Sequence, residues 1–158
     1  MRKSKLIVLF LVAALIVVFT IGCGGAKKEA PPPAKKVSLA TGGTSGTYYP
    51  IGAAITSIIT KFVPGVEATA ESTGASVANL KMIAEKKVDF IMGASNTTLS
   101  AFKGEEPFEK PIDNIRGITS LYPETFQFIV LKNSKMQTIK DLKGKRVVVG
   151  APGSGTER

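Results

Sequence analysis

The chain has 158 residues, of which 44% are hydrophobic, and it carries one cysteine, no histidine and a formal net charge of +9. A single cysteine excludes an internal disulfide, and the lack of histidine excludes a histidine-based catalytic triad or zinc site in this chain. Most of the excess charge lies near the N-terminus, because residues 37–158 carry 14 basic and 11 acidic side chains, a net +3. Without a stripe of clustered Lys and Arg, we expect no nucleic-acid partner.

The N-terminal segment predicts export. Three basic residues precede the apolar run 6–21, and Gly22 and Cys23 follow it, as in a secretory signal. The run is shorter than the roughly 20 residues that cross a bilayer, so we expect a signal peptide at residues 1–22. The Gly22-Cys23 pair resembles a bacterial lipobox with Cys23 as the lipidation site; the alternative is a leftover cysteine in a cleaved signal.

Residues 23–36 contain the run AKKEAPPPAKK, which is rich in proline and charge and has no apolar period. Such a composition is typical of a flexible tether that belongs to no folded unit. We therefore expect an extracytoplasmic domain, in the periplasm or at the cell surface, that this tether anchors to the membrane through lipidated Cys23.

Strand and helix patterns alternate in the next stretch. Residues 37–40 are strand-like and run into a loop rich in glycine and hydroxyl groups. Pro50 is well placed as the first residue of a helix that ends before Pro64-Gly65. The expected apolar face of this helix, which would lie on a sheet, consists of Ile51, Ile55, Ile58, Ile59 and Phe62.

Two further strand and helix pairs follow. Residues 66–71 alternate apolar and polar side chains, as in a strand, and a tight turn at 73–76 leads to a helix whose buried stripe is Val77, Leu80, Ile83 and Ala84. Residues 88–92 read as a third strand, and Asn96 is the expected cap of a third helix through Phe102. This alternation predicts a parallel α/β sheet, whose ligands bind beyond the carboxyl ends of the strands.

The rest of the chain has a different pattern. We expect strands at 115–122 and 126–131, a short helix closing at 141–145, and a strand at 146–149 that enters the loop GAPGSGT, with a helix beginning near Thr156. This loop approximates a phosphate-binding loop, but Thr156 stands where that motif needs lysine. The glycines at 42, 43 and 46 also lack the GxGxxG spacing, so no nucleotide cofactor is expected.

Three stretches resemble the TAXI branch of the solute-binding proteins of TRAP transporters. They are TGGTSGTYYPIG at 41–52, ESTGASVANL at 71–80 and DLKGKRVVVGAPGSGTE at 141–157. Ser45 and Ala75 depart from this pattern, since the family often has glycine at these two turn positions.

The resemblance implies a two-lobed clamshell of the type II periplasmic binding protein kind. Residues 37–132 would form the first α/β lobe and residues 133–158 the truncated start of the second. Family members take up small organic anions, including glutamate-like amino acids and dicarboxylates, and deliver them to membrane subunits.

Polar groups at the predicted strand ends are the expected ligand site. Amides and hydroxyls of the first loop would bind a carboxylate, helped by the following helix. The predicted ligand-binding residues are Thr41, Gly42, Gly43, Thr44, Gly46, Thr47, Tyr48, Tyr49, Thr73, Ser76, Asn79, Ser95, Asn96, Ser154, Gly155 and Thr156. The alternatives are that the first loop is a structural turn, that one tyrosine is core, and that Ser76 only caps its helix, with Asn79 suited to either role.

We therefore expect a receptor that captures a small carboxylate for a TRAP-type transporter, without enzymatic activity, cofactor or metal. Two alternatives remain open from the sequence: a surface lipoprotein with a structural or adhesive role, and a binding protein of an ATP-driven importer.

Overall fold

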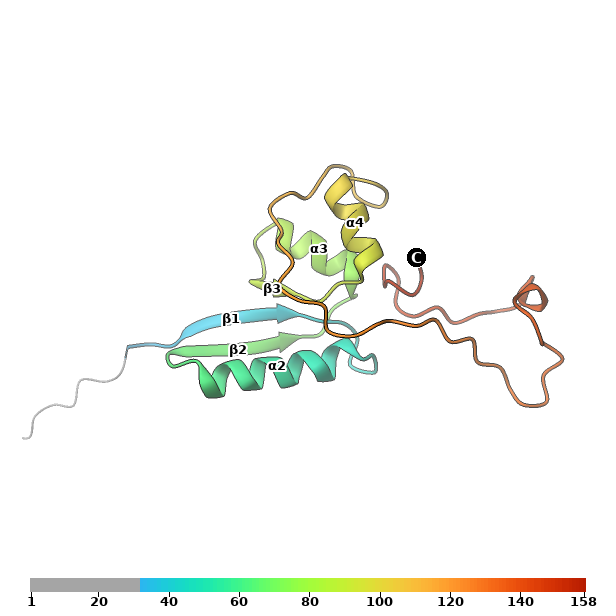
Figure 1. The fold of residues 1–158 in the computed structure, drawn as a ribbon, viewed down its shortest axis with the longest axis horizontal. Coiled ribbons are helices and arrows are strands. Elements are labelled where there is room, and N and C mark those ends of the chain that lie inside the picture. The colour runs from blue at the N-terminus through green and yellow to red at the C-terminus, as the bar shows by residue number, and fades with distance from the viewer. Residues whose placement is uncertain (1–31) are drawn as a thin grey trace, which may run out of the picture. The chain divides into compact units, whose positions relative to one another are not determined.

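The computed structural model describes residues 32–158, and Pro33–Arg158 form the unit described below (Figure 1). The predicted signal peptide, Cys23 and the tether up to residue 31 lie outside the described residues. Within residues 32–158, no helix has both the length and the apolar character that a membrane crossing requires.

Three parallel strands form the sheet, in the order β2-β1-β3. Their bounds are Lys35–Ala40 for β1, Val66–Glu71 for β2 and Phe90–Ile91 for β3. The central strand β1 pairs with β2 over its full length, and its last residue Ala40 is opposite both Glu71 and Ile91. The predicted parallel α/β arrangement is confirmed, although β1 starts two residues earlier than expected and β3 is shorter.

Helices cover both faces of this sheet. In Figure 1, α2 (Tyr48–Phe62) lies below the strands, and α3 (Ser76–Ala84) and α4 (Ser95–Lys103) lie above them. The prediction that Pro50 opens the first helix was wrong by two residues; Pro50 is tolerated in the first turn because an amide there needs no partner within the helix. The prediction that Asn96 caps the third helix was also wrong, since Ala94 is its N-cap.

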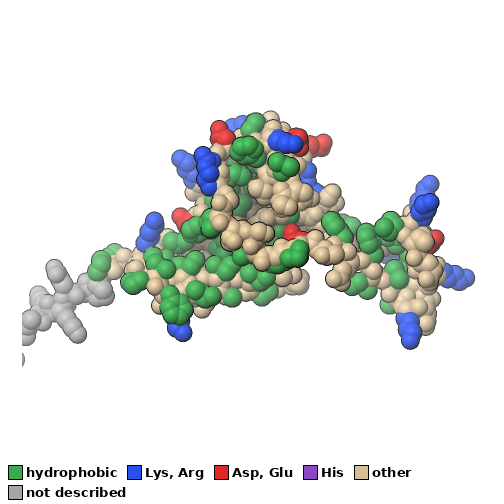
Figure 2. All heavy atoms as spheres, in the orientation of Figure 1, with side chains coloured by type: hydrophobic (Ala, Val, Ile, Leu, Met, Phe, Trp, Pro, Cys, Tyr) green, Lys and Arg blue, Asp and Glu red, His purple; other side chains and the backbone are tan. Residues whose placement is uncertain are grey.

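The helix α2 faces the sheet differently from the expected apolar stripe. Its buried residues are Gly52 and Thr56, whereas Ile58 is 57% exposed and Phe62 is 67% exposed. A Cβ atom at Gly52 would lie only 2.4 Å from Cγ2 of Thr41, so glycine lets the helix approach β1 and its loop closely. Figure 2 shows apolar side chains at the surface over this helix. The narrow sheet covers too little of the helix to bury the whole stripe.

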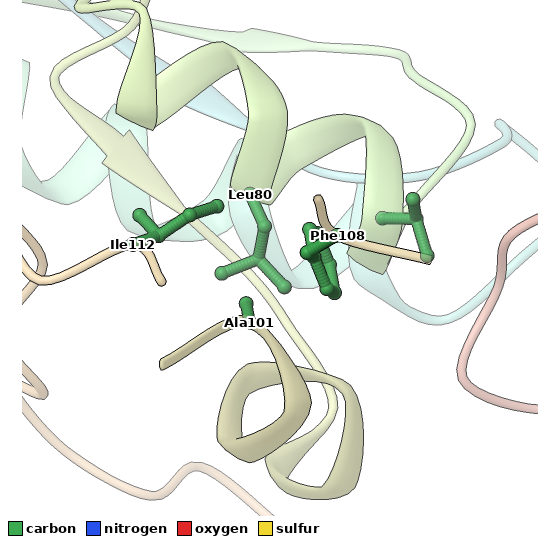
Figure 3. Close-up of a cluster of buried hydrophobic side chains, with 5 residues drawn as sticks. Leu80, Ala101, Phe108 and Ile112 are labelled. Carbon is green, nitrogen blue, oxygen red and sulfur yellow. The ribbon is translucent and has the colours of Figure 1, made fainter. Parts of the chain in front are cut away.

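The apolar core lies on the opposite face, between α3, α4 and the chain that follows α4 (Figure 3). Gly104 ends α4 in the left-handed region, with φ of +73°, and a Cβ atom there would lie 2.5 Å from the backbone nitrogen of Pro111. This close approach turns the chain back toward α3. The residues of the cluster are Val77, Leu80, Ala101, Phe108 and Ile112.

The strands predicted at 115–122, 126–131 and 146–149 are not formed. Between residues 116 and 149 the only regular element is the 3₁₀ helix η1 (Ile139–Leu142), which begins with a capping box between Thr138 and Asp141. Apolar side chains in this stretch are exposed, with Ile129 at 86% and Val148 at 97%. A strand needs a hydrogen-bonded neighbour, and no described segment pairs with these residues.

Candidate functional site

The three loops that follow the strands meet at one edge of the sheet. They meet because β1, β2 and β3 are parallel and end in register at Ala40, Glu71 and Ile91. The first two loops contact each other directly, since Ser72 Oγ and the Thr73 amide both donate to the Gly42 carbonyl, at 3.1 and 3.3 Å. This edge, which we call the polar edge, gathers the loop residues that the sequence placed in one site.

Asn79 joins the ends of two strands from beneath the polar edge. Its side-chain nitrogen lies 2.6 Å from the Thr41 carbonyl, 2.8 Å from the Met92 carbonyl and 3.3 Å from the Ala40 carbonyl. Its side-chain oxygen accepts from the Thr73 hydroxyl at 2.6 Å. Asn79 is fully buried and all its side-chain polar atoms have partners. Of the two roles that the sequence left open, ligand binding and a structural role, its side chain has the structural one.

Three other predicted residues also have partners inside the fold. The hydroxyl of Thr41 donates to the Glu71 carbonyl at 2.7 Å, and that of Thr73 accepts from the Ala75 amide at 3.1 Å. Ser76 is the first residue of α3, and its Oγ accepts from the Ala94 amide at 3.0 Å instead of capping its own helix. The bonds of Thr41 and Ser76 join segments that are distant in the sequence, and the bond of Thr73 stabilises its own turn.

The turn before α3 is strained at Ala75. Its φ of +66° and ψ of −146° lie in a region that residues with a Cβ atom rarely adopt. Ala75 is one of the two turn positions at which the sequence departs from the pattern of the resembled family, where glycine is often found. Ser45, the other such position, has no positive φ.

The loop from Gly43 to Thr47 is the open part of the polar edge. All five of its residues are exposed, and within residues 32–158 the hydroxyls of Thr44, Ser45 and Thr47 form no hydrogen bond. Thr47 is the N-cap of α2 without a side-chain cap. The first amides of α2 therefore face this loop without side-chain partners, and the partial positive charge of the helix end favours an anion there.

The two tyrosines of the first turn of α2 point to different places. The Tyr48 hydroxyl donates to Oε2 of Glu124 at 3.1 Å, on the side where Ser76 lies. Tyr49 lines an open groove of about 530 Å³ between α2 and β2, together with residues such as Thr56 and Thr60. This groove lies beside the sheet and contains none of the other predicted site residues. Tyr48 is therefore the tyrosine of the polar edge.

Burial raises the pKa of Tyr48 well above its ordinary value, and the negative charge of Glu124 raises it further. Burial followed by the charge of Glu124 also raises the pKa of Tyr122. Both phenols therefore keep their protons at neutral pH, and each presents one O–H donor and acceptor lone pairs.

Ser95 and Asn96 are exposed in the first turn of α4, next to the Ala94 amide that Ser76 holds. Their backbone positions place them at the polar edge, at the end of the third strand. Asn96 makes one long contact, in which its Oδ1 accepts from the Thr97 hydroxyl at 3.4 Å.

The last loop of the chain packs on the beginning of α3. The Gly153 carbonyl accepts from the Val77 amide at 3.1 Å, and a Cβ atom at Gly155 would lie 2.4 Å from Cβ of Ala94. Ser154 is buried. The expected helix near Thr156 is absent, because residues 155–157 form a turn in which the Glu157 amide donates to Ser154 Oγ. Gly153 to Gly155 thus lie against the same edge as the first three loops.

One residue that meets this edge was missed by the sequence reasoning, namely Glu124, which accepts from the Tyr48 hydroxyl. It belongs to a stretch in which strands were predicted, and it meets Tyr48 only through the fold. A single acidic residue after Pro123 is too common a pattern to indicate a site.

No group of three or more His, Cys, Asp or Glu side chains in the described part of the chain is arranged to hold a metal ion. The polar edge offers hydrogen bonds and charge, which suit the binding of a small polar molecule.

A model of the NMT1-like family matches residues 39–158. The matched range begins inside β1 and includes the loops of the polar edge, the core helices and the last loop.

Proposed function

The chain belongs to the NMT1-like family, a periplasmic-binding-protein-like family related to the TAXI and NMT1 solute-binding proteins, and from this membership we propose a specific transport role. The protein is the receptor of a TRAP-type secondary transporter of the TAXI branch, and it captures a small carboxylate and delivers it to the membrane subunits. It works outside the cytoplasm, anchored through lipidated Cys23. The family consists of binding proteins that are typically not enzymes, and we propose no catalytic step.

The fold supports this proposal. A three-stranded parallel sheet with helices on both faces is consistent with one lobe of a periplasmic binding protein. In such α/β units ligands bind beyond the carboxyl ends of the strands, and the polar edge is at that end. A second lobe, beginning at about residue 133, would close over the ligand from the other side.

The observation that carries the proposal is that some polar groups of the polar edge are bonded within the fold and others are not. Buried hydroxyls and the Asn79 amide connect the loops. In contrast, the hydroxyls of Thr44 and Thr47 and the amides of the first two residues of α2 have no hydrogen-bond partner in the described chain. Pre-positioned donors at a helix N-terminus bind a carboxylate with little loss of conformational freedom. A turn with a purely structural role would not need these exposed hydroxyls.

Calorimetric titration of the full chain with glutamate, glutamine and dicarboxylates tests the proposal. The double variant Thr44→Ala/Thr47→Ala removes two exposed donors without disturbing the buried bonds. It should weaken binding by about tenfold or more, because each hydrogen bond to a charged group contributes about 1.5–3 kcal/mol and about 1.4 kcal/mol corresponds to tenfold. Ser57→Ala is the matched control, because it removes an exposed hydroxyl from the same helix away from its N-terminus.

An equal loss in both variants, or unchanged binding in the double variant, would place the carboxylate elsewhere. If no compound of the panel binds, the receptor proposal fails, and a surface lipoprotein with a structural role becomes the better explanation of the fold. Binding with transport that depends on ATP would instead support the importer alternative.

A further inference from the structure

The net charge of the described chain lies in one segment. Residues 132–146 contain five lysines and one arginine but a single acidic residue, Asp141, which gives them a net charge of +5. The other described residues, 32–131 and 147–158, contain ten basic and ten acidic side chains, so their net charge is zero. We call residues 132–146 the basic segment.

The positive charges of the basic segment are open to solvent. All six of its basic residues are exposed. The ion pairs within residues 32–158 lie elsewhere, at 85–87 and 103–105. The carboxylate of Asp141 accepts from the amide and the hydroxyl of Thr138, at 2.8 and 3.0 Å, and caps η1. No acidic side chain of the described chain therefore forms an ion pair with these six residues.

Local hydrogen bonds keep part of this charge close together. The Lys143 amide donates to the Lys140 carbonyl at 3.2 Å, and the Lys145 amide donates to the Leu142 carbonyl at 2.9 Å. Three lysines thus follow one another within two successive turns. Like charges held near one another repel, and an anionic partner removes this cost.

The length of chain before the sheet indicates which anionic partner is within reach. Cys23 and Lys35, the first residue of β1, are 12 positions apart. A chain of that length spans at most about 40 Å when fully extended. With lipid on Cys23, as proposed above, the start of β1 would stay within that distance of the membrane, so the membrane surface is always near the folded unit.

The composition of the basic segment also favours a lipid surface. It contains no aromatic side chain, so it offers no ring on which a nucleic-acid base could stack. Its charges are spaced along the segment and do not form one continuous run. Lysines distributed in this way bind a surface of phosphate headgroups through the summed attraction of their charges, without a fixed geometry.

We propose that the basic segment docks on the anionic phospholipid headgroups of the membrane that anchors the chain. This inference rests on the proposed function, since the anchor through Cys23 brings the segment to the membrane. Attachment at two points would keep the folded unit close to the membrane subunits to which the receptor delivers its ligand.

Sedimentation with lipid vesicles tests the proposal. The chain from residue 23 onward with Cys23→Ser has no lipid and keeps the whole unit Pro33–Arg158. It should bind mixed vesicles of phosphatidylcholine and phosphatidylglycerol at least about 100-fold more tightly than vesicles of phosphatidylcholine alone, because each lysine near an anionic surface contributes about fivefold. Salt at about 1 M should abolish this preference, because it shortens the Debye length to about 3 Å.

Substitutions separate the basic segment from the charge of the rest of the chain. The triple variant Lys140→Gln/Lys143→Gln/Lys145→Gln should weaken binding to the mixed vesicles by about 100-fold, at about fivefold for each lysine. The double variant Lys132→Gln/Lys135→Gln should weaken it by about 25-fold on the same basis.

The matched control is Lys81→Gln/Lys86→Gln/Lys110→Gln, which removes the same charge from exposed positions outside the segment. It should change binding by less than about threefold, because the loss should follow the position of the charge and not its sum. Thermal unfolding shows whether each variant is folded, and the double variant tests the segment even if the triple variant does not fold.

Equal binding to both kinds of vesicle, or to neither, overturns the docking and leaves an acidic protein surface as the partner of the segment. Equal losses in the triple variant and its control also overturn it. The receptor function stands in these cases, because carboxylate binding is measured separately. A chain that carries no lipid on Cys23 would contradict the anchoring, whereas failure of the carboxylate titrations would contradict the receptor function.

Discussion

The loop that begins α2 and the loop that begins α3 contain the same kinds of residue but use them differently. In the α3 loop, the Thr73 hydroxyl is bonded inside the fold and meets the buried Asn79. In the α2 loop, the hydroxyls of Thr44 and Thr47 are exposed and unbonded in the described structure. Hydroxyl groups at strand ends are therefore evidence of a site only when the fold leaves them free. Changes on the two sides of the polar edge should accordingly affect different properties.

The largest effect is expected for Asn79→Leu, on the bonded side. Leucine is close in size to asparagine, but it leaves the Met92 carbonyl and the Thr73 hydroxyl without their Asn79 partner, and the Thr41 carbonyl keeps only the Thr73 hydroxyl as a donor. We expect the free energy of unfolding to fall by about 3 kcal/mol, because buried groups that lose a partner cost about 1–3 kcal/mol each. Urea denaturation measures this change.

Asn96→Ala is the control, because Asn96 is exposed at the start of α4. It should change stability by less than about 0.5 kcal/mol, as surface substitutions usually do. Equal effects of the two variants would contradict the structural role of Asn79.

A smaller effect, of opposite sign, is expected for Ala75→Gly. Glycine adopts the backbone conformation of Ala75 without strain, although it also gains freedom in the unfolded chain. The net result should be a gain of about 1 kcal/mol in the free energy of unfolding, visible as a higher melting temperature. Ala78→Gly, inside α3, should instead cost about 1 kcal/mol. Destabilisation by both glycines would show that the turn is not strained.

The smallest effect concerns Tyr48, on the open side, and depends on pH. Burial raises its pKa above the ordinary value of 10.0, so the folded chain holds the phenol proton where the unfolded chain has released it. This contribution to stability is complete below about pH 10 and is lost as the pH rises through the raised pKa. Unfolding measured at about pH 8 and about pH 10.5 should therefore show a smaller decline in Tyr48→Phe than in the unaltered chain. An identical decline would argue that the phenol is as solvated as in the unfolded chain.

Local sequence patterns predicted helices and strands well where apolar residues recur at a regular spacing. The alternation in residues 66–71 correctly predicted β2. Of the stripe predicted for α3, Val77 and Leu80 are buried, whereas Ile83 and Ala84 are only half-buried. The same reasoning failed at 126–131 and 146–149, because β-rich composition shows that a segment can pair but not that a partner is present. It also overestimated the burial of Ile58 and Phe62, since periodicity does not tell how much of a helix the sheet can cover.

The gathering of polar residues at one edge of the sheet was predictable from the sequence, but the hydrogen bonds that each of them makes were not. Glycine and hydroxyl residues after three parallel strands had to gather at one edge, because parallel strands end on the same side. Which hydroxyls are free depends on contacts between loops, such as that of Thr41 with Glu71, thirty residues apart. The meeting of Tyr48 with Glu124, 76 residues apart, has no local signal at all.

By itself, the order of residues determined the strand and helix alternation, the family, and the edge at which polar groups collect, because these depend on short-range periodicity and on backbone direction. Only the tertiary structure decided that Asn79 binds strand carbonyls, that Tyr48 and not Tyr49 faces the polar edge, and that Glu124 meets Tyr48 there. The reason is physical: whether a donor or acceptor is satisfied depends on its neighbours in space, and distant segments supply those neighbours.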